Sequence, residues 1–482
     1  MAYLTAYFYC FLLLLLTAYY LLPLHWRWVV LMIGSALFFC HTAIAGRKIL
    51  LLTVIVSYFL ALLIHGIKGK KSRLLSQILL FVSVGISLFP LIATKYGESL
   101  QMALLHRVRI GLTAPIGISF YTLQIISYLL DVYNGFIEPQ RNIFKYCLYV
   151  TFFPQIIQGP IPKYSRLSKQ LYEGHRFDEE TFCKGFMLIL WGFFLKYMIA
   201  DKASVVVDTV FSDYYKYSGV YIFMAGSLYS LQLYADFLAC TTISRGVSSL
   251  FGIQLDNNFN HPYFARSIQD FWRRWHISLS TWLRDYVYIP LGGNRKGKAA
   301  KYLFLILTFA LSGIWHGVGI RFLIWGLIHA AFQIIGDLLS PVRHKLCVLL
   351  KINEKSCGYR IYRTLVTIFF VMNAWIIFRA NTLEQGFRML LSMYTTYNPW
   401  VLFDNSLFQL GLDRTESQLL VFSSAVLFIV SLAQEKINLR DWFYHKNIAF
   451  RYFVYLSLIL FIWLYGTYGY GFEPKDFIYG GF

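Results

Sequence analysis

Two histidines in this sequence each directly follow a tryptophan. His276 lies in a stretch rich in arginine and tryptophan, whereas His316 ends an apolar run and is flanked by Gly313 and Gly317. Imidazole is the side chain best suited to accept a proton near neutral pH, so this pair could supply a general base and a hydrogen-bonding partner. Buried histidines are also often structural, and a metal site would need a third ligand, which has no usual spacing here. Catalysis and structure therefore both remain open.

Other polar residues interrupt apolar segments, where a charged side chain costs about 2.5–3.5 kcal/mol on insertion scales. Gln232 and Asp236 are four residues apart and share one helical face. The carboxylate could form a salt bridge with an arginine or orient a catalytic group. A second polar set either lines a cavity or joins neighbouring helices by hydrogen bonds, and we favour the second role. It comprises Gln124, Tyr128, Asp131, Gln155 and Gln158.

The elements that must position these residues are membrane helices. Of 482 residues, 57% are hydrophobic and 14% are charged, whereas soluble proteins carry about 25% charged residues. Apolar stretches of about 15–22 residues recur, a length that crosses roughly 30 Å of hydrocarbon as a helix. The sequence predicts one all-α polytopic membrane domain with about eleven transmembrane helices. The clearest spans are Tyr3–Leu24, Ile49–Ile64, Leu74–Leu91, Phe182–Ile199, Lys301–Trp315 and Phe450–Tyr468.

The net charge of +20 could indicate nucleic-acid binding, but the basic residues do not gather on a soluble face. They cluster in short loops between predicted spans, at residues 68–73, 163–169, 295–301 and 343–355. Lysine and arginine in short loops mark the cytoplasmic side of a membrane protein. The pattern therefore predicts a membrane lipid environment and no nucleic-acid partner. Since three predicted spans precede the first basic loop, we expect an extracytoplasmic N-terminus.

The segment Arg266–Gly293 is too charged to span a membrane and too aromatic for a solvated loop. On a helical wheel its large apolar side chains fall on one side and most of its arginines on the other. Such a segment either lies at the membrane interface or enters a cavity lined by protein. The expected apolar side comprises Trp272, Trp275, Leu279, Trp282 and Leu283.

Residues 258–297 resemble the signature of the membrane-bound O-acyltransferase superfamily, and more narrowly its bacterial alginate O-acetyltransferase branch. The resemblance is carried by Phe-Trp-Arg-Arg-Trp-His at 271–276 and by Ile-Pro-Leu-Gly-Gly-Asn-Arg-Lys-Gly at 289–297. It implies packed helices around a central tunnel open to both sides. Within the single domain, we expect N-terminal spans over 1–100, a catalytic core over 101–400 and C-terminal spans over 401–482. Further stretches similar to the branch are 115–133, 153–160, 312–326, 375–380, 477–479 and Phe482.

The resemblance also implies roles for individual residues. His316 matches the family's catalytic histidine, and His276 matches the second polar residue of its active site. Trp315 and Gly317 match neighbours that shape the tunnel. Further residues that we expect to line the tunnel or contact substrate are Trp275, Ser278, Trp282, Arg284, Asp285, Asp236, Gln232 and Gln155.

The implied donor substrate is acetyl-coenzyme A or another acyl thioester, which would enter from the cytoplasm; no bound cofactor and no metal are expected. Arg295, Lys296 and Lys298 could contact its phosphates. The acyl group would pass to an extracytoplasmic partner protein or polysaccharide at the bacterial cytoplasmic membrane. Two alternatives remain open. One is D-alanyl transfer to teichoic acid from a carrier-protein thioester. The other is a proton-coupled transporter or channel, although the paired broken helices of many transporters are not evident in the sequence.

Overall fold

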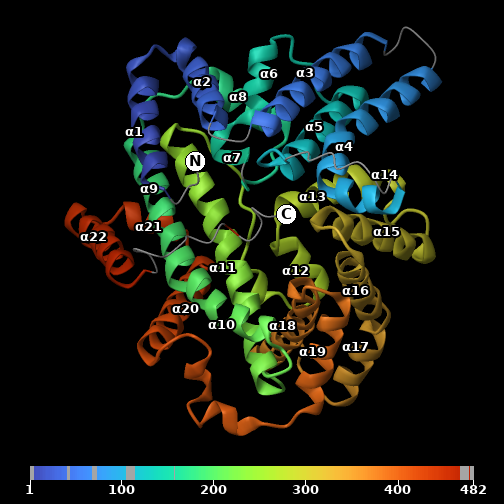
Figure 1. Cartoon of the computed structure of the whole chain (residues 1–482), viewed down its shortest axis with the longest axis vertical. Coiled ribbons are helices and arrows are strands. Elements are labelled where there is room, and N and C mark those ends of the chain that lie inside the picture. Colours follow the sequence, from blue (N-terminus) through green and yellow to red (C-terminus); the bar gives the residue numbers. More distant parts are fainter. Residues whose placement is uncertain are drawn as a thin grey trace. The chain divides into compact units, whose positions relative to one another are not determined.

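The computed structural model describes residues 5–40, 44–67, 73–104, 114–156, 158–466 and 477. Within these ranges all regular elements are helices, and eight helical runs are long and apolar enough to cross a membrane (Figure 1). The predicted all-α polytopic fold is confirmed, while the central tunnel and the number of eleven spans stay predictions. The eight runs are α3 (Ile44–Ile67), Leu74–Gly97 of α4 (Arg73–Leu104), Glu179–Ser212, α15 (Lys298–His316), α16 (Ile320–Leu338), α18 (Cys357–Arg379), α20 (Arg414–Gln434) and α22 (Ile448–Tyr465).

Each of the clearest predicted spans coincides with a helix. The span Tyr3–Leu24 corresponds to α1 (Ala6–Leu21), which has 16 residues. Residues 3, 4, 467 and 468 of the first and last predicted spans lie outside the described residues, as do residues 68–72 of the first basic loop.

The helices form two compact units. Among the described residues, the first unit comprises those up to 189 together with 240–256, and the second comprises 190–239, 257–466 and 477. The boundaries fall inside α9 (Glu179–Phe194) and α11 (Val220–Leu250). The other helices of the first unit are α2 (Arg27–Cys40), α5 (Ile118–Asn134), α6 (Ile143–Thr151), α7 (Phe153–Ile156) and α8 (Tyr164–Glu173).

The polar face of α5 joins this helix to its neighbours within the first unit. The Gln124 side chain donates a hydrogen bond from Nε2 to the Tyr149 carbonyl oxygen of α6, at 2.7 Å. The Tyr128 hydroxyl accepts a hydrogen bond from the Gln140 backbone N–H, at 2.8 Å. The prediction that this polar set links helices is confirmed for Gln124, whereas Tyr128 binds the loop that precedes α6.

The apolar run over residues 143–156 does not form one continuous helix. Helix α6 ends at Thr151, Phe152 has a non-helical ψ of 106°, and α7 begins at Phe153. Pro154 has no backbone N–H, and inside a continuous helix its ring would clash with the carbonyl of residue 150. Proline is tolerated in the first turn of a helix, where α7 places it.

In the second unit, glycines allow α15 and α16 to pack backbone against backbone. A Cβ added at Gly313 would lie 2.3 Å from the Phe322 carbonyl oxygen, and one at Gly326 would lie 2.2 Å from that of Phe309. Near their other ends the two helices are joined by the ion pair between Lys301 and Asp337, at 2.7 Å. The pair is therefore antiparallel, with His316 at one end and the basic start of α15 at the other. The space beside Gly313 is occupied by α16.

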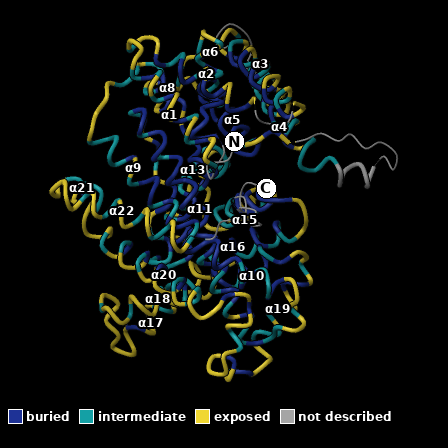
Figure 2. Tube along the Cα trace, turned by 60° about the vertical axis from the view of Figure 1, so that its left-hand side comes forward, coloured by how far each residue is buried: buried dark blue, intermediate teal, exposed yellow. Residues whose placement is uncertain are grey.

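Helices α12 (Ile268–Arg274) and α18 pack against α16, and α19 (Leu383–Thr395) packs against α18. Helix α17 (Ser340–Leu349) follows α16 and is largely exposed (Figure 2).

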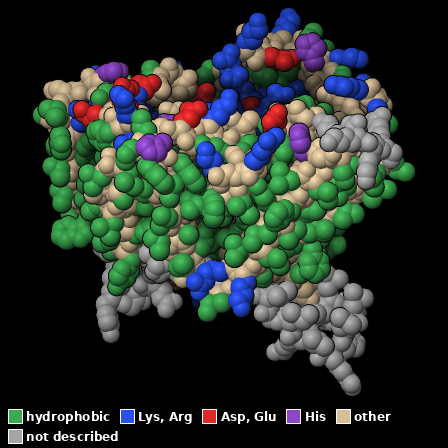
Figure 3. Space-filling view, turned by 90° about the horizontal axis from the view of Figure 1, so that it is seen from above, with side chains coloured by type: hydrophobic (Ala, Val, Ile, Leu, Met, Phe, Trp, Pro, Cys, Tyr) green, Lys and Arg blue, Asp and Glu red, His purple; other side chains and the backbone are tan. Residues whose placement is uncertain are grey.

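The face seen in Figure 3 is mostly hydrophobic, and Lys and Arg gather along its upper edge and in a small group at its lower edge. Helix α22 has no buried residue, so its apolar side chains are available to lipid. The remaining helices of this unit are α10 (Asp201–Ser212), α13 (Ile277–Leu283), α14 (Ile289–Leu291) and α21 (Leu439–Tyr444), with short 3₁₀ and π segments between helices.

The contact between α15 and α16 gives a stability prediction. We expect Gly326→Ala to destabilise the protein by about 1–3 kcal/mol, because the added methyl would meet a backbone oxygen that no side-chain rotation can move. The measurement is the thermal unfolding of purified protein in detergent. Gly336 is the control, because it lies on the same helix and a Cβ there has nothing within 4 Å. Gly336→Ala should leave the melting temperature unchanged or raise it slightly. Equal melting temperatures for the two variants would contradict the close contact.

Candidate active site

His276 lies at a break between two short helices. Helix α12 ends at Arg274, Trp275 is extended, and α13 begins at Ile277. His276 itself has φ 44° and ψ 55°, in the left-handed region that residues other than glycine seldom adopt. Such conformations persist only where the surrounding structure imposes them, and they cluster at functional sites.

Asn258 provides much of that surrounding structure. Its Oδ1 accepts hydrogen bonds from the Ser278 backbone N–H at 3.0 Å and from the Ser278 hydroxyl at 2.8 Å. Its carbonyl oxygen accepts the Ile277 N–H at 2.9 Å. Asn258 is buried, so these bonds are shielded from water. The sequence analysis gave Asn258 no role, and placed Ser278 only among the tunnel-lining residues.

The helical wheel drawn over Arg266–Gly293 assumed one continuous helix, which is wrong. The segment consists of α12, α13, the π-helical turn η4 (Arg284–Tyr288) and α14. The division into sides is nevertheless correct for the apolar residues. Trp272, Trp275, Leu279, Trp282 and Leu283 are all buried.

The two histidines meet at one tryptophan. The Trp315 ring centroid lies 4.9 Å from that of His316 and 6.2 Å from that of His276. The exposed fractions of His276 and His316 are 1% and 2%. The structure thus brings together two buried imidazoles that are forty positions apart in the sequence, one at the break between α12 and α13 and one at the end of α15.

Aromatic rings contact both imidazoles nearly at right angles. The His276 ring packs against Phe237 of α11 at 4.8 Å and 83°. The His316 ring packs against Trp325 of α16 at 5.1 Å and 89°, and against Phe378 of α18 at 5.6 Å and 82°. Edge-to-face contacts of this kind are a preferred geometry of aromatic pairs. Each imidazole is therefore held by rings from neighbouring helices.

Gly317 allows the close approach of one further ring to this group. A Cβ at Gly317 would lie 2.1 Å from an atom of the Phe322 ring. Phe322 in turn lies 5.2 Å from Phe378. The glycine therefore admits part of the aromatic packing around His316.

A third buried histidine, His329 on α16, was missed by the sequence analysis. Its exposed fraction is 0%, and its Nδ1 accepts a hydrogen bond from the Trp272 indole N–H at 3.3 Å. The sign in the sequence that could have pointed to His329 was its position in the middle of an apolar run.

Asp236 forms a buried ion pair, although its partner is a lysine and not the arginine considered from the sequence. The Lys196 ammonium lies 2.8 Å from Asp236 and 3.0 Å from Asp201. All three side chains are at most 5% exposed. Lys196 lies on the π-helical turn η2 (Leu195–Ala200), a rare geometry that often occurs at functional sites. The Phe477 ring centroid lies 4.8 Å from the ammonium, whereas residues 478–482 lie outside the described residues.

The other predicted residues lie in several places. Trp282 packs against Tyr286 at 5.4 Å. Arg284 is largely exposed and pairs with Asp285 at 2.9 Å. Gln232 is buried one turn before Asp236 on α11, and Gln155 is buried in α7 of the first unit. The residues expected near donor phosphates, Arg295, Lys296 and Lys298, are exposed at the start of α15.

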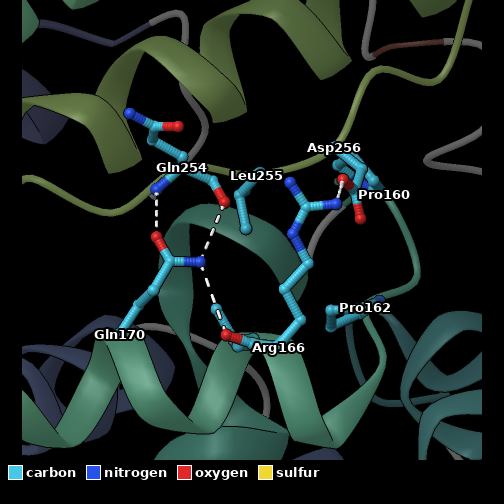
Figure 4. Close-up of a pocket in the computed structure, with 8 residues that line it drawn as sticks. Pro160, Pro162, Arg166, Gln170, Gln254, Leu255 and Asp256 are labelled. Atoms are coloured by element: carbon cyan, nitrogen blue, oxygen red, sulfur yellow. Dashed lines mark hydrogen bonds and ion pairs between the residues drawn. The ribbon is translucent and has the colours of Figure 1, made fainter.

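A small, open pocket lies in the first unit, between α8 and the segment after α11 (Figure 4). Gln170 Oε1 accepts the Gln254 backbone N–H at 2.8 Å, and Gln170 Nε2 donates to the Gln254 carbonyl at 3.2 Å. The Arg166 guanidinium pairs with Asp256. Because these polar groups bond to one another, we interpret them as a structural link between α8 and the segment after α11. Among the described residues, no group of three His, Cys, Asp or Glu side chains is arranged to hold a metal ion.

The comparison with known proteins bears directly on the histidine pair. Residues 136–376 match the membrane-bound O-acyltransferase family, and this range contains both His276 and His316. The chain belongs to that family. It is therefore a multi-pass membrane acyltransferase, and an enzyme is supported over the transporter alternative.

Individual relatives place the chain near the alginate O-acetyltransferase branch. A probable alginate O-acetylase of Pseudomonas syringae is 33% identical over 388 residues, which cover 79% of this chain and 72% of the relative. A peptidoglycan O-acetyltransferase of Helicobacter pylori is 32% identical over 401 residues, covering 75% and 72%. A teichoic acid D-alanyltransferase of Bacillus subtilis is 29% identical over 309 residues, covering 62% and 77%.

The buried ion cluster gives a second prediction. Lys196→Met would leave two buried carboxylates without their cation, and we expect a loss of about 3–5 kcal/mol in the free energy of unfolding. The measurement is unfolding of the purified protein in detergent. The triple variant Lys196→Met, Asp201→Asn, Asp236→Asn should recover part of the loss, because it removes the uncompensated charges.

The exposed pair Arg388–Glu384 supplies the control. Surface ion pairs contribute about 0–1 kcal/mol, so Arg388→Met should change the stability only slightly. A Lys196→Met variant as stable as Arg388→Met would show that the buried cluster is not an ionised triad.

Proposed function

We propose that the enzyme moves an acetyl group from acetyl-coenzyme A on the cytoplasmic side to a hydroxyl acceptor on the other side of the bacterial cytoplasmic membrane. Its product would be an O-acetylated extracytoplasmic polysaccharide, reached directly or through an acyl-accepting partner protein. The observation that carries this proposal is the meeting of two buried imidazoles at Trp315. The acetyltransferase relatives support the choice of acyl group.

In the proposed reaction, His316 is the general base. It takes the proton of the acceptor hydroxyl while the hydroxyl oxygen attacks the thioester carbonyl carbon. His276 donates a hydrogen bond to the carbonyl oxygen, on which negative charge develops. The tetrahedral intermediate collapses by breaking the carbon–sulfur bond, and the thiolate takes the proton from His316. The overall change is from thioester and alcohol to ester and thiol, with the base regenerated.

The antiparallel pair α15 and α16 supports the proposed direction of transfer. The basic residues lie at the start of α15 and His316 at the other end of this 19-residue helix, which is about 28 Å long. Since basic loops lie on the cytoplasmic side, the donor phosphates would bind near Arg295, Lys296 and Lys298. The acceptor would approach His316 from the far side. The same rule supports an extracytoplasmic N-terminus as part of the proposal.

D-alanyl transfer from a carrier-protein thioester is the second candidate, supported by the Bacillus subtilis relative. The two candidates share the chemistry at histidine and differ in the donor. Supplying purified enzyme with either free acetyl-coenzyme A or a D-alanyl-loaded carrier protein separates them. Turnover of the carrier alone would replace the acetyl proposal.

The first functional prediction concerns His316. We expect His316→Ala to lose about 10²–10⁴-fold in the rate of thiol release from labelled acetyl-coenzyme A, the usual effect of removing a general base. The protein should still insert and elute as a folded species in detergent. Wild-type rates in a folded His316→Ala protein would end the assignment.

A second functional prediction concerns the basic start of α15. Replacing Arg295, Lys296 and Lys298 by Gln should raise the KM for acetyl-coenzyme A roughly tenfold, if each exposed contact contributes about 0.5 kcal/mol. The effect should shrink at high salt, which screens exposed charges. A short acetyl thioester without phosphates is the matched control, and its KM should not change. An equal change for both donors would argue against phosphate binding there.

A further inference from the structure

Trp325 is among the most enclosed side chains beside His316. Its exposed fraction is 0%, and its ring meets the His316 imidazole edge to face at 5.1 Å. It also stacks on Trp375 at 5.6 Å and 22°, and it contacts Phe378 at 5.0 Å. On another side it contacts His329 at 5.0 Å. Rings on several sides leave the Trp325 indole little freedom to rotate.

The Trp325 indole N–H has no hydrogen-bond acceptor within the part of the chain that the structure describes. Leaving a buried donor without an acceptor destabilises the fold, so such groups are rare and call for an explanation. The nearby indole of Trp272 shows the usual arrangement, because it donates to His329 Nδ1 at 3.3 Å. Trp325 therefore holds a fixed donor, directly beside the proposed base, for which the described protein supplies no acceptor.

We propose that the Trp325 indole N–H donates a hydrogen bond to the acyl carbonyl oxygen of the donor thioester, and is thus a further catalytic residue. This inference rests on the proposed function, because it takes His316 as the base. An indole N–H is only a donor and does not titrate near neutral pH. It can stabilise negative charge without competing for the proton that His316 accepts.

The donor acts in one identifiable step. When the acceptor oxygen bonds to the carbonyl carbon, the carbonyl π electrons move to oxygen and the hydroxyl proton moves to His316. Trp325 then hydrogen-bonds an oxyanion in place of a neutral carbonyl oxygen. Fixed donors in a water-excluded site stabilise this charge strongly, and losing one typically costs about 10²–10³-fold in kcat. The carbon–sulfur bond then breaks, the electrons return to the carbonyl, and the thiolate takes the proton from His316.

Trp375 on α18 provides a matched comparison within the same stack. It is also 0% exposed, and the Tyr263 hydroxyl is a hydrogen-bond partner for its indole N–H. Its ring contacts in the described chain are with Phe271, Trp275, Trp325, His329 and Phe378, and none is with His316. The proposal therefore assigns the catalytic donor to Trp325 and not to Trp375.

The test compares Trp325→Phe with Trp375→Phe in purified enzyme, using labelled acetyl-coenzyme A. We expect Trp325→Phe to lower kcat by about 10²–10³-fold while the Kd for the donor stays near the wild-type value. Trp375→Phe should keep most of the activity, since it loses a comparable ring without touching the base. Because Trp325→Phe could unfold, a second variant carries 3-benzothienylalanine at position 325. That residue keeps the shape of the two fused rings and replaces N–H by sulfur.

The outcomes separate this inference from the proposed function. A folded 3-benzothienylalanine variant with wild-type kcat would overturn the donor role of Trp325, and so would equal losses when the same replacement is made at positions 325 and 375. If His316→Ala is inactive while the Trp325 variants are fully active, the proposed function stands and only this inference fails. If His316→Ala is fully active, the proposed function itself fails.

Discussion

The close packing of α15 against α16 is the constraint on which the site depends. Backbone meets backbone at Gly313 and Gly326, where a methyl group would approach a carbonyl oxygen to about 2.2–2.3 Å. Because the helices approach so closely, the last turn of α15 lies directly against the first turns of α16. This brings His316 against Trp325 and brings Gly317 against the Phe322 ring. Bulkier residues at these positions would separate the two helices and remove the surface that holds the imidazole.

The second imidazole is placed by a different means. His276 lies at a break, and its left-handed backbone conformation is enforced by hydrogen bonds from residues 277 and 278 to Asn258. In a continuous helix, the position of residue 276 in the sequence would fix the direction in which its side chain points. The break lets the His276 side chain point in a different direction, while Trp272 before it and Trp282 after it remain buried. The unusual geometry is thus local, and the regular helices on both sides of it stay amphipathic.

The hydrophobic pattern was enough to predict the all-α membrane fold, because apolar length and helical periodicity are properties of the local sequence. It also predicted which side of the Arg266–Gly293 segment is buried. It did not predict the break at His276, which depends on hydrogen bonds to a residue about twenty positions earlier. The partner of Asp236 was likewise out of reach, because Lys196 is forty positions away and only the folded structure brings the two charges together.

The two histidines were found from their residue type and their neighbours, but the surroundings of His316 were not. Trp325 and His329 lie in an apolar run where aromatic residues ordinarily indicate a core. Their place beside His316 follows from the turn between α15 and α16, which a periodicity argument does not fix. The missing acceptor of the Trp325 N–H is a property of three-dimensional packing alone. Sequence therefore pointed to the proposed base, whereas only the structure points to a donor for the negative charge that develops on the substrate.

The kinds of contact around the site also differ in a way that suits catalysis. Lys196 is held by two carboxylates, so its charge is committed to the fold. His316 is contacted on several sides by the faces and edges of aromatic rings, which restrict its orientation by shape. A proposed base that is held in one orientation is preorganised for proton transfer. Charge therefore fixes the lysine, whereas aromatic packing contributes to fixing the imidazole within the same apolar helical unit.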